Sequence, residues 1–112
     1  MIKVTFYRDS FNRLSSFFAD GHADFAEAGD DIVCSAVSSV LQAARLGLEM
    51  YVRVPLDVEQ KKGHIRITWP ENKRNDVAIN AIVETARMSV EQIARQFPEN
   101  VECNTETLDR VR

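Results

Sequence analysis

Residues 32–50 read IVCSAVSSVLQAARLGLEM. Apolar side chains recur in this stretch at the spacing of an α-helix, at Val33, Val37, Val40, Ala44 and Leu48. The pattern predicts an amphipathic helix over residues 32–50 that packs one side onto a core. Asp30 or Asp31 is a suitable N-cap for it.

Upstream of this helix the apolar residues alternate with polar ones. Ile2, Val4 and Phe6 follow this period of two, which predicts a half-buried strand over residues 2–7. Turn-forming residues at 8–13 and an apolar run at 14–19 predict a hairpin. Residues 20–31 are acidic and glycine-containing and have no clear period, so we expect a loop of about twelve residues there. A loop of that length in a small domain is usually functional or disordered.

Downstream, a second hairpin and a second helix are expected. Residues 51–58 and 64–69 alternate like strands, although Pro55 argues against a central strand at its position. Residues 75–97 have a helical apolar stripe that Pro98 ends, and residues 100–105 suggest a short last strand. The order β-β-α-β-β-α-β predicts one α+β domain over residues 1–112. We expect a two-layer sandwich, with a mostly antiparallel sheet of four to five strands and two helices on one face.

Composition narrows the functional class. Apolar residues make up 45% of the 112 residues and the net charge is −3, which disfavours direct nucleic-acid binding. No run approaches about 18 apolar residues and no signal peptide is recognisable, so we expect a cytoplasmic protein without membrane contact. In that reducing compartment Cys34 and Cys103 are expected to be free thiols.

Cys34 is a candidate nucleophile. It lies at the border of the apolar stripe, in the first turn of the predicted helix, where free amides favour a thiolate and could hold an oxyanion. His22 lies upstream in the loop and could take the thiol proton. Against this, Asp30 and Asp31 oppose thiolate formation unless one of them orients His22. The residues alone leave open a structural cysteine beside an unrelated loop histidine.

The remaining candidate residues favour structural interpretations. A zinc site would need closely spaced ligands, and this spacing is absent among the histidines and cysteines, namely His22, Cys34, His64 and Cys103. We therefore expect no metal. His64 is expected to be solvated, Cys103 to be a small apolar filler and Trp69 a core residue. Two short basic runs flank the second predicted hairpin, namely Lys61 and Lys62, and Lys73 and Arg74. They could contact RNA, but a solvated face is the preferred interpretation.

One segment resembles a known family. The run Gly21-His22-Ala23, then Gly29, then Asp31-Ile32-Val33-Cys34, followed by Ala36 and Ser38, is similar to the ribosomal-processing cysteine protease family Prp, also called YsxB-like. The shared pattern is a Gly-His pair, a loop and a cysteine that opens a helix. Ser35 is a small departure, because the family often has alanine there.

The resemblance implies a cytoplasmic, usually homodimeric enzyme without a cofactor. Its substrate would be the L-twenty-seven protein of the large ribosomal subunit, and it would remove an N-terminal extension after an aromatic pair. His22 and Cys34 would be the catalytic dyad, and Gly21, Asp31 and Ser38 would support it. Gly21 would let the backbone turn, Asp31 would cap the helix or steer His22, and Ser38 would bond to the loop or the substrate. The loop 23–33 would be a candidate lid.

Two rival hypotheses remain. The chain could be a non-catalytic ribosome-associated factor that binds the same protein, or Cys34 could have a redox or acyl-transfer role. Binding that survives Cys34→Ala without any cleavage would favour the first. Reversible oxidation of Cys34 that is independent of His22 would favour the second.

Overall fold

The computed structural model describes residues 1–21 and 28–108, with the side chains of residues 28–31 left out. The elements follow one another as β1 Ile2–Arg8, β2 Leu14–Asp20, α1 Ala28–Leu46, the π-helix η1 Gly47–Val52, β3 Asp57–Lys61, β4 His64–Thr68, the 3-10 helix η2 Glu71–Lys73, α2 Val77–Gln96 and β5 Val101–Thr107. The predicted order of strands and long helices is confirmed.

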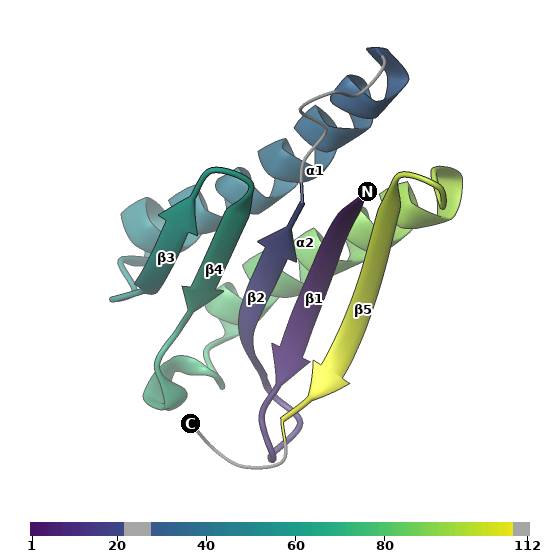
Figure 1. The fold of residues 1–112 in the computed structure, drawn as a ribbon. Helices are drawn as coiled ribbons and strands as arrows, with labels where there is room; N and C mark the ends of the chain where they lie inside the picture. Colours follow the sequence, from purple (N-terminus) through teal and green to yellow (C-terminus); the bar gives the residue numbers. More distant parts are fainter. Residues whose placement is uncertain (22–27, 109–112) are drawn as a thin grey trace.

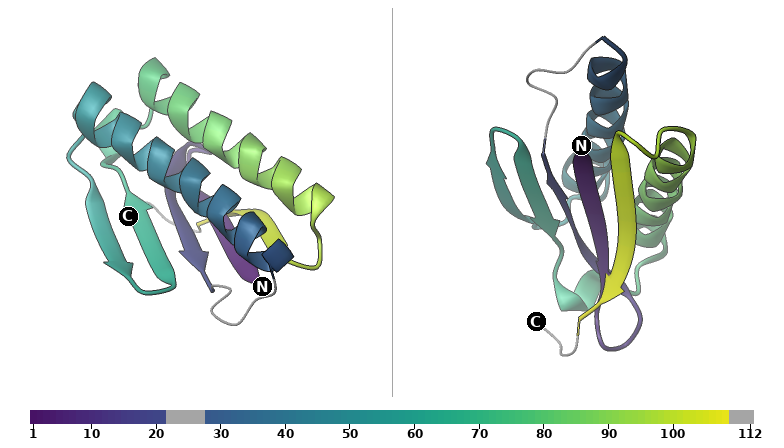
Figure 2. Two further views of the ribbon diagram at one scale, coloured as in Figure 1. Left: turned by 90° about the horizontal axis from the view of Figure 1, so that it is seen from above. Right: turned by 45° about the vertical axis from the view of Figure 1, so that its right-hand side comes forward.

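The strands form one sheet in the order β3-β4-β2-β1-β5. All neighbouring pairs are antiparallel except β1 and β5, which run parallel from the Ile2–Val101 pair onward. Both long helices cover the same face of the sheet and contact each other (Figures 1 and 2). The expected α+β two-layer sandwich is therefore confirmed.

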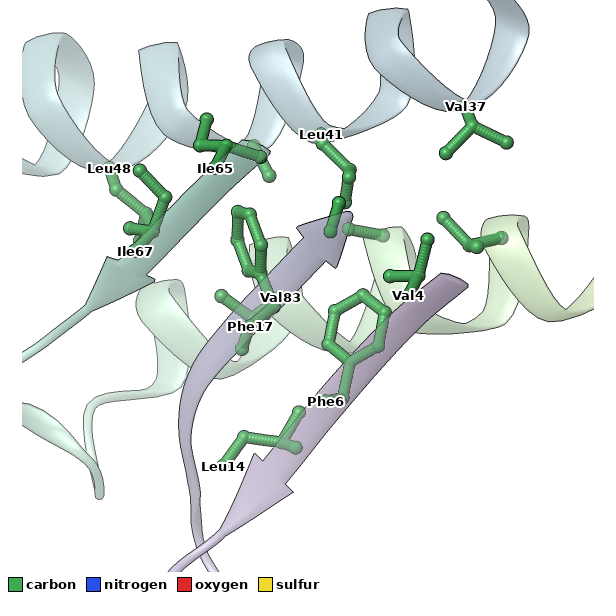
Figure 3. Packing of buried hydrophobic residues seen from close by; sticks show 14 of the residues in the cluster. Val4, Phe6, Leu14, Phe17, Val37, Leu41, Leu48, Ile65, Ile67 and Val83 are labelled. Atoms are coloured by element: carbon green, nitrogen blue, oxygen red, sulfur yellow. The ribbon is translucent and has the colours of Figure 1, made fainter. Parts of the chain in front are cut away.

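The core lies between the sheet and the helices, as the alternation predicted. Val4 and Phe6 of β1 point toward Val37 and Leu41 of α1 and Val83 of α2 (Figure 3). Trp69 is fully buried, as expected, and its indole N–H donates to the Leu14 carbonyl. Residues 32–52 are long and apolar enough to resemble a membrane span by composition. Their apolar stripe is instead buried against the sheet, as in a core helix.

Two predicted boundaries were wrong. The expected strand 51–58 starts only at Asp57, because the chain continues from α1 into the π-helix η1, which ends at Val52. Arg53 then reverses the chain in a left-handed conformation (φ 62°), and Pro55 lies in the connection, where no ladder donor is needed. At the other end of the same helix, α1 begins at Ala28 rather than near residue 32. Asp30 and Asp31 are therefore helix residues and not its N-cap.

The end of the sheet opposite the start of α1 is held by a buried ion pair. The Asp9 carboxylate accepts from Arg74 at 3.2 Å and from Nε of Arg13 at 3.0 Å, and Arg74 also donates to the Trp69 carbonyl. Arg74 is only 3% exposed, so its predicted place in a solvated basic run was wrong. Its charge is compensated by an aspartate that lies 65 residues earlier in the chain.

Candidate active site

A cleft of about 200 Å³ lies between α1 and the β3–β4 hairpin. Its floor is apolar and buried, and consists of Ile2, Ala19, Val37, Leu41 and Ile65. Polar residues stand along its two sides, namely Cys34, Ser38 and Gln42 from α1 and Gln60 and Lys61 from β3, with Gly21, Gly63 and His64 at the end. The cleft thus pairs an apolar floor with polar walls, which is typical of a binding site for a peptide or another organic ligand.

Cys34 reaches this cleft from the border of the helix stripe. Its side chain is partly exposed and packs against the core on one side. Ser38 and Gln42 follow one and two helical turns later and line the same wall. The structure therefore brings the predicted residues Cys34 and Ser38 into one cleft.

The predicted position of Cys34 in the first turn was wrong. It is the seventh residue of α1, so its own amide faces a carbonyl of the preceding turn and is not free. The helix dipole also weakens beyond the first turn. Free amides of the helix N-terminus are accordingly not available at Cys34 to hold an oxyanion.

Gly21 forms the end of the cleft where β2 stops. Its φ of +99° belongs to the region that favours glycine, and its N–H donates to the Gly63 carbonyl at 2.9 Å. A methyl group on Gly21 would overlap the backbone carbonyl of Met1. The next residue, His22, and the side chain of Asp31 lie outside the described part of the chain. The lid expected over 23–33 is described only from residue 28, where the backbone is already helical.

His64 is less exposed than expected. Its side chain is 21% exposed and packs edge-on against Phe18, with ring centroids 4.8 Å apart. Its nitrogens lie 3.8 Å from Asp20 and 4.0 Å from Glu59. The cross-strand partner of His64 in β2 is Asp20, which follows Phe18 and Ser16 on the face away from the helices. The His64 side chain therefore packs on the face of the sheet away from the helices, at the strand end that borders the cleft.

Cys103 has a different environment from Cys34. It lies in β5, half-buried and packed against the core, and it does not line the cleft. Burial, followed by the nearby Glu91 carboxylate, raises its pKa to about 11, although Arg87 partly opposes this. The Cys103 thiol is therefore almost fully protonated at neutral pH, which fits a filler residue.

Sequence reasoning missed Gln42 of the α1 wall and the whole β3 wall of the cleft. Gln42 could have been found, because it continues the helical spacing of Cys34 and Ser38. Gln60 and Lys61 could not, because the predicted strand ended before them. Among residues 1–21 and the described side chains after residue 31, no three His, Cys, Asp or Glu side chains form a group that could hold a metal.

Comparisons with known proteins agree over nearly the whole chain. A family model described as Cysteine protease Prp matches residues 1–102. The Ribosomal processing cysteine protease Prp of Bacillus subtilis is 29% identical over 109 residues, which cover 94% of this chain and 97% of that protein. The protein of the same name from Staphylococcus aureus is 29% identical over 107 residues, covering 93% and 98%.

Solved structures show the same similarity. The S. aureus Prp structure in complex with a covalently linked product peptide has a TM-score of 0.82 and 27% identity, and covers 94% of this chain and 99% of that one. The S. aureus structure in complex with a substrate peptide has a TM-score of 0.83 and 25% identity, with the same coverage.

Proposed function

Because this chain belongs to the cysteine protease Prp family and is a cysteine protease, we propose that it is an endopeptidase that processes the L-twenty-seven protein of the large ribosomal subunit. It removes an N-terminal extension by cutting after an aromatic pair. The catalytic dyad is Cys34 and His22, with Gly21, Asp31 and Ser38 in support. The enzyme acts in the cytoplasm as a homodimer, without a cofactor.

The main support for this proposal is the position of Cys34. Of the two cysteines, Cys34 lines the cleft, whereas Cys103 is half-buried elsewhere and has a raised pKa. The apolar floor of the cleft suits a large apolar side chain next to the scissile bond. The names and bound peptides of the relatives support a peptide substrate and a covalent step.

The chemistry follows from a thiol and an imidazole. His22 takes the proton of the Cys34 thiol, and the thiolate sulfur attacks the scissile carbonyl carbon. The C–N bond then breaks, and the leaving amine receives the proton from His22. A thioester remains on Cys34, and water that is deprotonated by His22 hydrolyses it. The products are a new carboxylate, a new amine and the free enzyme.

The test is a cleavage assay with a peptide that spans the extension of the host's own L-twenty-seven protein. Wild type, Cys34→Ala and His22→Ala are compared under reducing conditions, and mass spectrometry locates the cut. We expect one cut after the aromatic pair with wild type and none with either variant.

Ser35→Ala is the matched control, because Ser35 neighbours Cys34 on α1 but does not line the cleft. It should cut like wild type. No cleavage by wild type would contradict the proposed substrate, and binding without cleavage would favour the ribosome-associated factor. Cleavage that persists in His22→Ala at an undiminished rate would contradict the dyad.

A further inference from the structure

A polar side chain in the β3 wall of the cleft is fixed in one orientation. Arg45 of α1 donates from Nη1 to the side-chain oxygen of Gln60 in β3, and from Nε to Glu49 at 2.7 Å. The three side chains connect the helix to the edge strand beside the cleft. Gln60 lines the same cleft as Cys34, but from the opposite side.

This contact determines which end of the Gln60 amide is left for a ligand. An arginine has only donors, so the amide atom that faces Arg45 must be the oxygen. The amide nitrogen of Gln60 therefore keeps both of its N–H donors, and it has no partner within the described residues. Because Gln60 is exposed, these donors are accessible to a ligand in the cleft.

A peptide bound in this cleft needs such a donor. If one of its side chains occupies the apolar floor, its backbone passes along the rim between Cys34 and Gln60. Backbone carbonyls that lose water on binding must find new donors, or the complex is weakened. Gln42 stands on the Cys34 side of the cleft, which leaves Gln60 as the side-chain donor of β3. Its neighbour Lys61 pairs with His64 on the face of the sheet away from the helices. Gln60, in contrast, pairs with the core residue Ile65 and is oriented by a helix residue.

Building on the proposed function, we propose that Gln60 donates a hydrogen bond to a main-chain carbonyl of the bound substrate, and that Arg45 is a positioning residue that fixes this donor. Gln60 thereby contributes to binding of the peptide backbone, independently of the side chain in the apolar floor. Neither residue takes part in the bond-breaking steps.

The first test replaces the donor and keeps the partner. Gln60→Glu retains an acceptor for Arg45 but presents a second oxygen where the N–H groups were, and Gln60→Met removes the polar group without adding charge. For both we expect KM for the extension peptide to rise about three- to tenfold, the worth of one hydrogen bond, with kcat within about twofold of wild type. Gln92→Glu is the matched control, since Gln92 also accepts from an arginine, Arg95, but on α2 outside the cleft.

The second test addresses the positioning role. Arg45→Met frees the amide to rotate and should raise KM about two- to threefold, whereas Arg45→Lys, again a pure donor, should restore the wild-type value. A loss of stability alone would change the melting temperature in both variants and would not be rescued in KM by lysine. In the Gln60→Met background, Arg45→Met should have no further effect on KM.

A labelling experiment separates this inference from the proposed substrate. Alkylation of Cys34 by a chloromethyl ketone with an aromatic dipeptide is compared with alkylation by iodoacetamide, which has no peptide backbone. Gln60→Met should slow the peptide reagent about three- to tenfold and leave the iodoacetamide rate unchanged. If wild type fails to cut the extension peptide but this ratio changes, the substrate is wrong and the role of Gln60 stands. Equal ratios and an unchanged KM in Gln60→Met would overturn the inference.

Discussion

At the scale of single residues, the two cysteines differ in access to the cleft, and burial makes Cys103 a weak acid. Cys34 lines an open cleft, whereas burial and Glu91 raise the pKa of Cys103 to about 11. A thiol of that pKa holds on the order of a hundredfold less thiolate at neutral pH than an ordinary cysteine. We therefore expect an alkylating reagent to react with Cys34 before Cys103.

We expect iodoacetamide at pH 7.5 to label Cys34 at least about thirtyfold faster than Cys103, because only the thiolate reacts. Mass spectrometry of the digested protein measures both rates. The Cys103 rate should rise as the pH approaches 11, and it should equal that of a free thiol once the protein is unfolded in urea. Comparable rates in the folded protein at pH 7.5 would contradict the environment described for Cys103.

Gly21 has a left-handed backbone at the end of the cleft. With φ at +99° and the Met1 carbonyl in the way, Gly21→Ala should cost about 2–4 kcal/mol of unfolding free energy and lower cleavage with it. Gly47→Ala is the matched comparison, because its added methyl would meet only the flexible Ile82 side chain at 3.2 Å. That variant should stay within about 1 kcal/mol. Urea denaturation measures the unfolding free energy of both variants. Equal losses of unfolding free energy would refute the backbone requirement at Gly21.

At the scale of secondary-structure elements, the Asp9–Arg74 pair holds the β1–β2 turn to the segment after β4. Burial by itself raises the pKa of Asp9, but hydrogen bonds from Arg13, the Phe11 amide and Arg74 outweigh it, so the pKa is lowered. A carboxylate with a lowered pKa stabilises the fold above its unfolded pKa of about 3.9, and loses that contribution as the pH falls through the folded value.

Asp9→Asn should therefore destabilise the protein by about 3–5 kcal/mol at pH 7, because it leaves the buried Arg74 without its counter-ion. The deficit relative to wild type should shrink as the pH falls from the unfolded pKa of about 3.9 through the lowered folded pKa, below which Asp9 of the wild type is also protonated. Urea titrations at pH 7 and pH 3 measure it. Glu71→Gln removes an exposed partner of Arg13 and should cost less than about 1 kcal/mol at either pH.

The elements that could be predicted from sequence are those with a local period. The alternation of β1 and β4 and the stripes of both helices are repeated often enough to be read directly. The start of α1 was missed because residues 28–31, Ala-Gly-Asp-Asp, add no apolar residue to the stripe. The alternation over 51–58 suggested a strand, but these residues form the end of the π-helix η1 and the connection to β3, which begins at Asp57.

The residues of the candidate site likewise differ in whether a local sequence pattern specifies them. Cys34 and Ser38 are one helical turn apart, so their common wall follows from the sequence. The facing wall depends on the pairing of β3 with β4, which brings Gln60 opposite Ile65, and no local pattern specifies that approach. The burial of Arg74 was missed for the same reason, because its partner Asp9 lies far away in the sequence.

At the scale of the whole molecule, the described residues share one core between the sheet and both helices. We therefore expect a single cooperative unfolding transition in urea. The fluorescence of Trp69, which is buried beside Phe17, should change at the same urea concentration as the helical circular dichroism. A separate transition in either signal would contradict a single domain.

Because β1 and β5 run parallel, the start of β1 and the end of β5 lie at opposite ends of the sheet, and this determines where an affinity tag can be fused. Ile2 forms part of the cleft floor and the Met1 carbonyl lies close to Gly21, so an affinity tag fused to Met1 would emerge at the mouth of the cleft. Leu108 is hydrogen-bonded to Arg8 at the opposite end of β1. An affinity tag is therefore better attached on the C-terminal side, beyond Leu108, which lies at the end of the sheet away from the cleft.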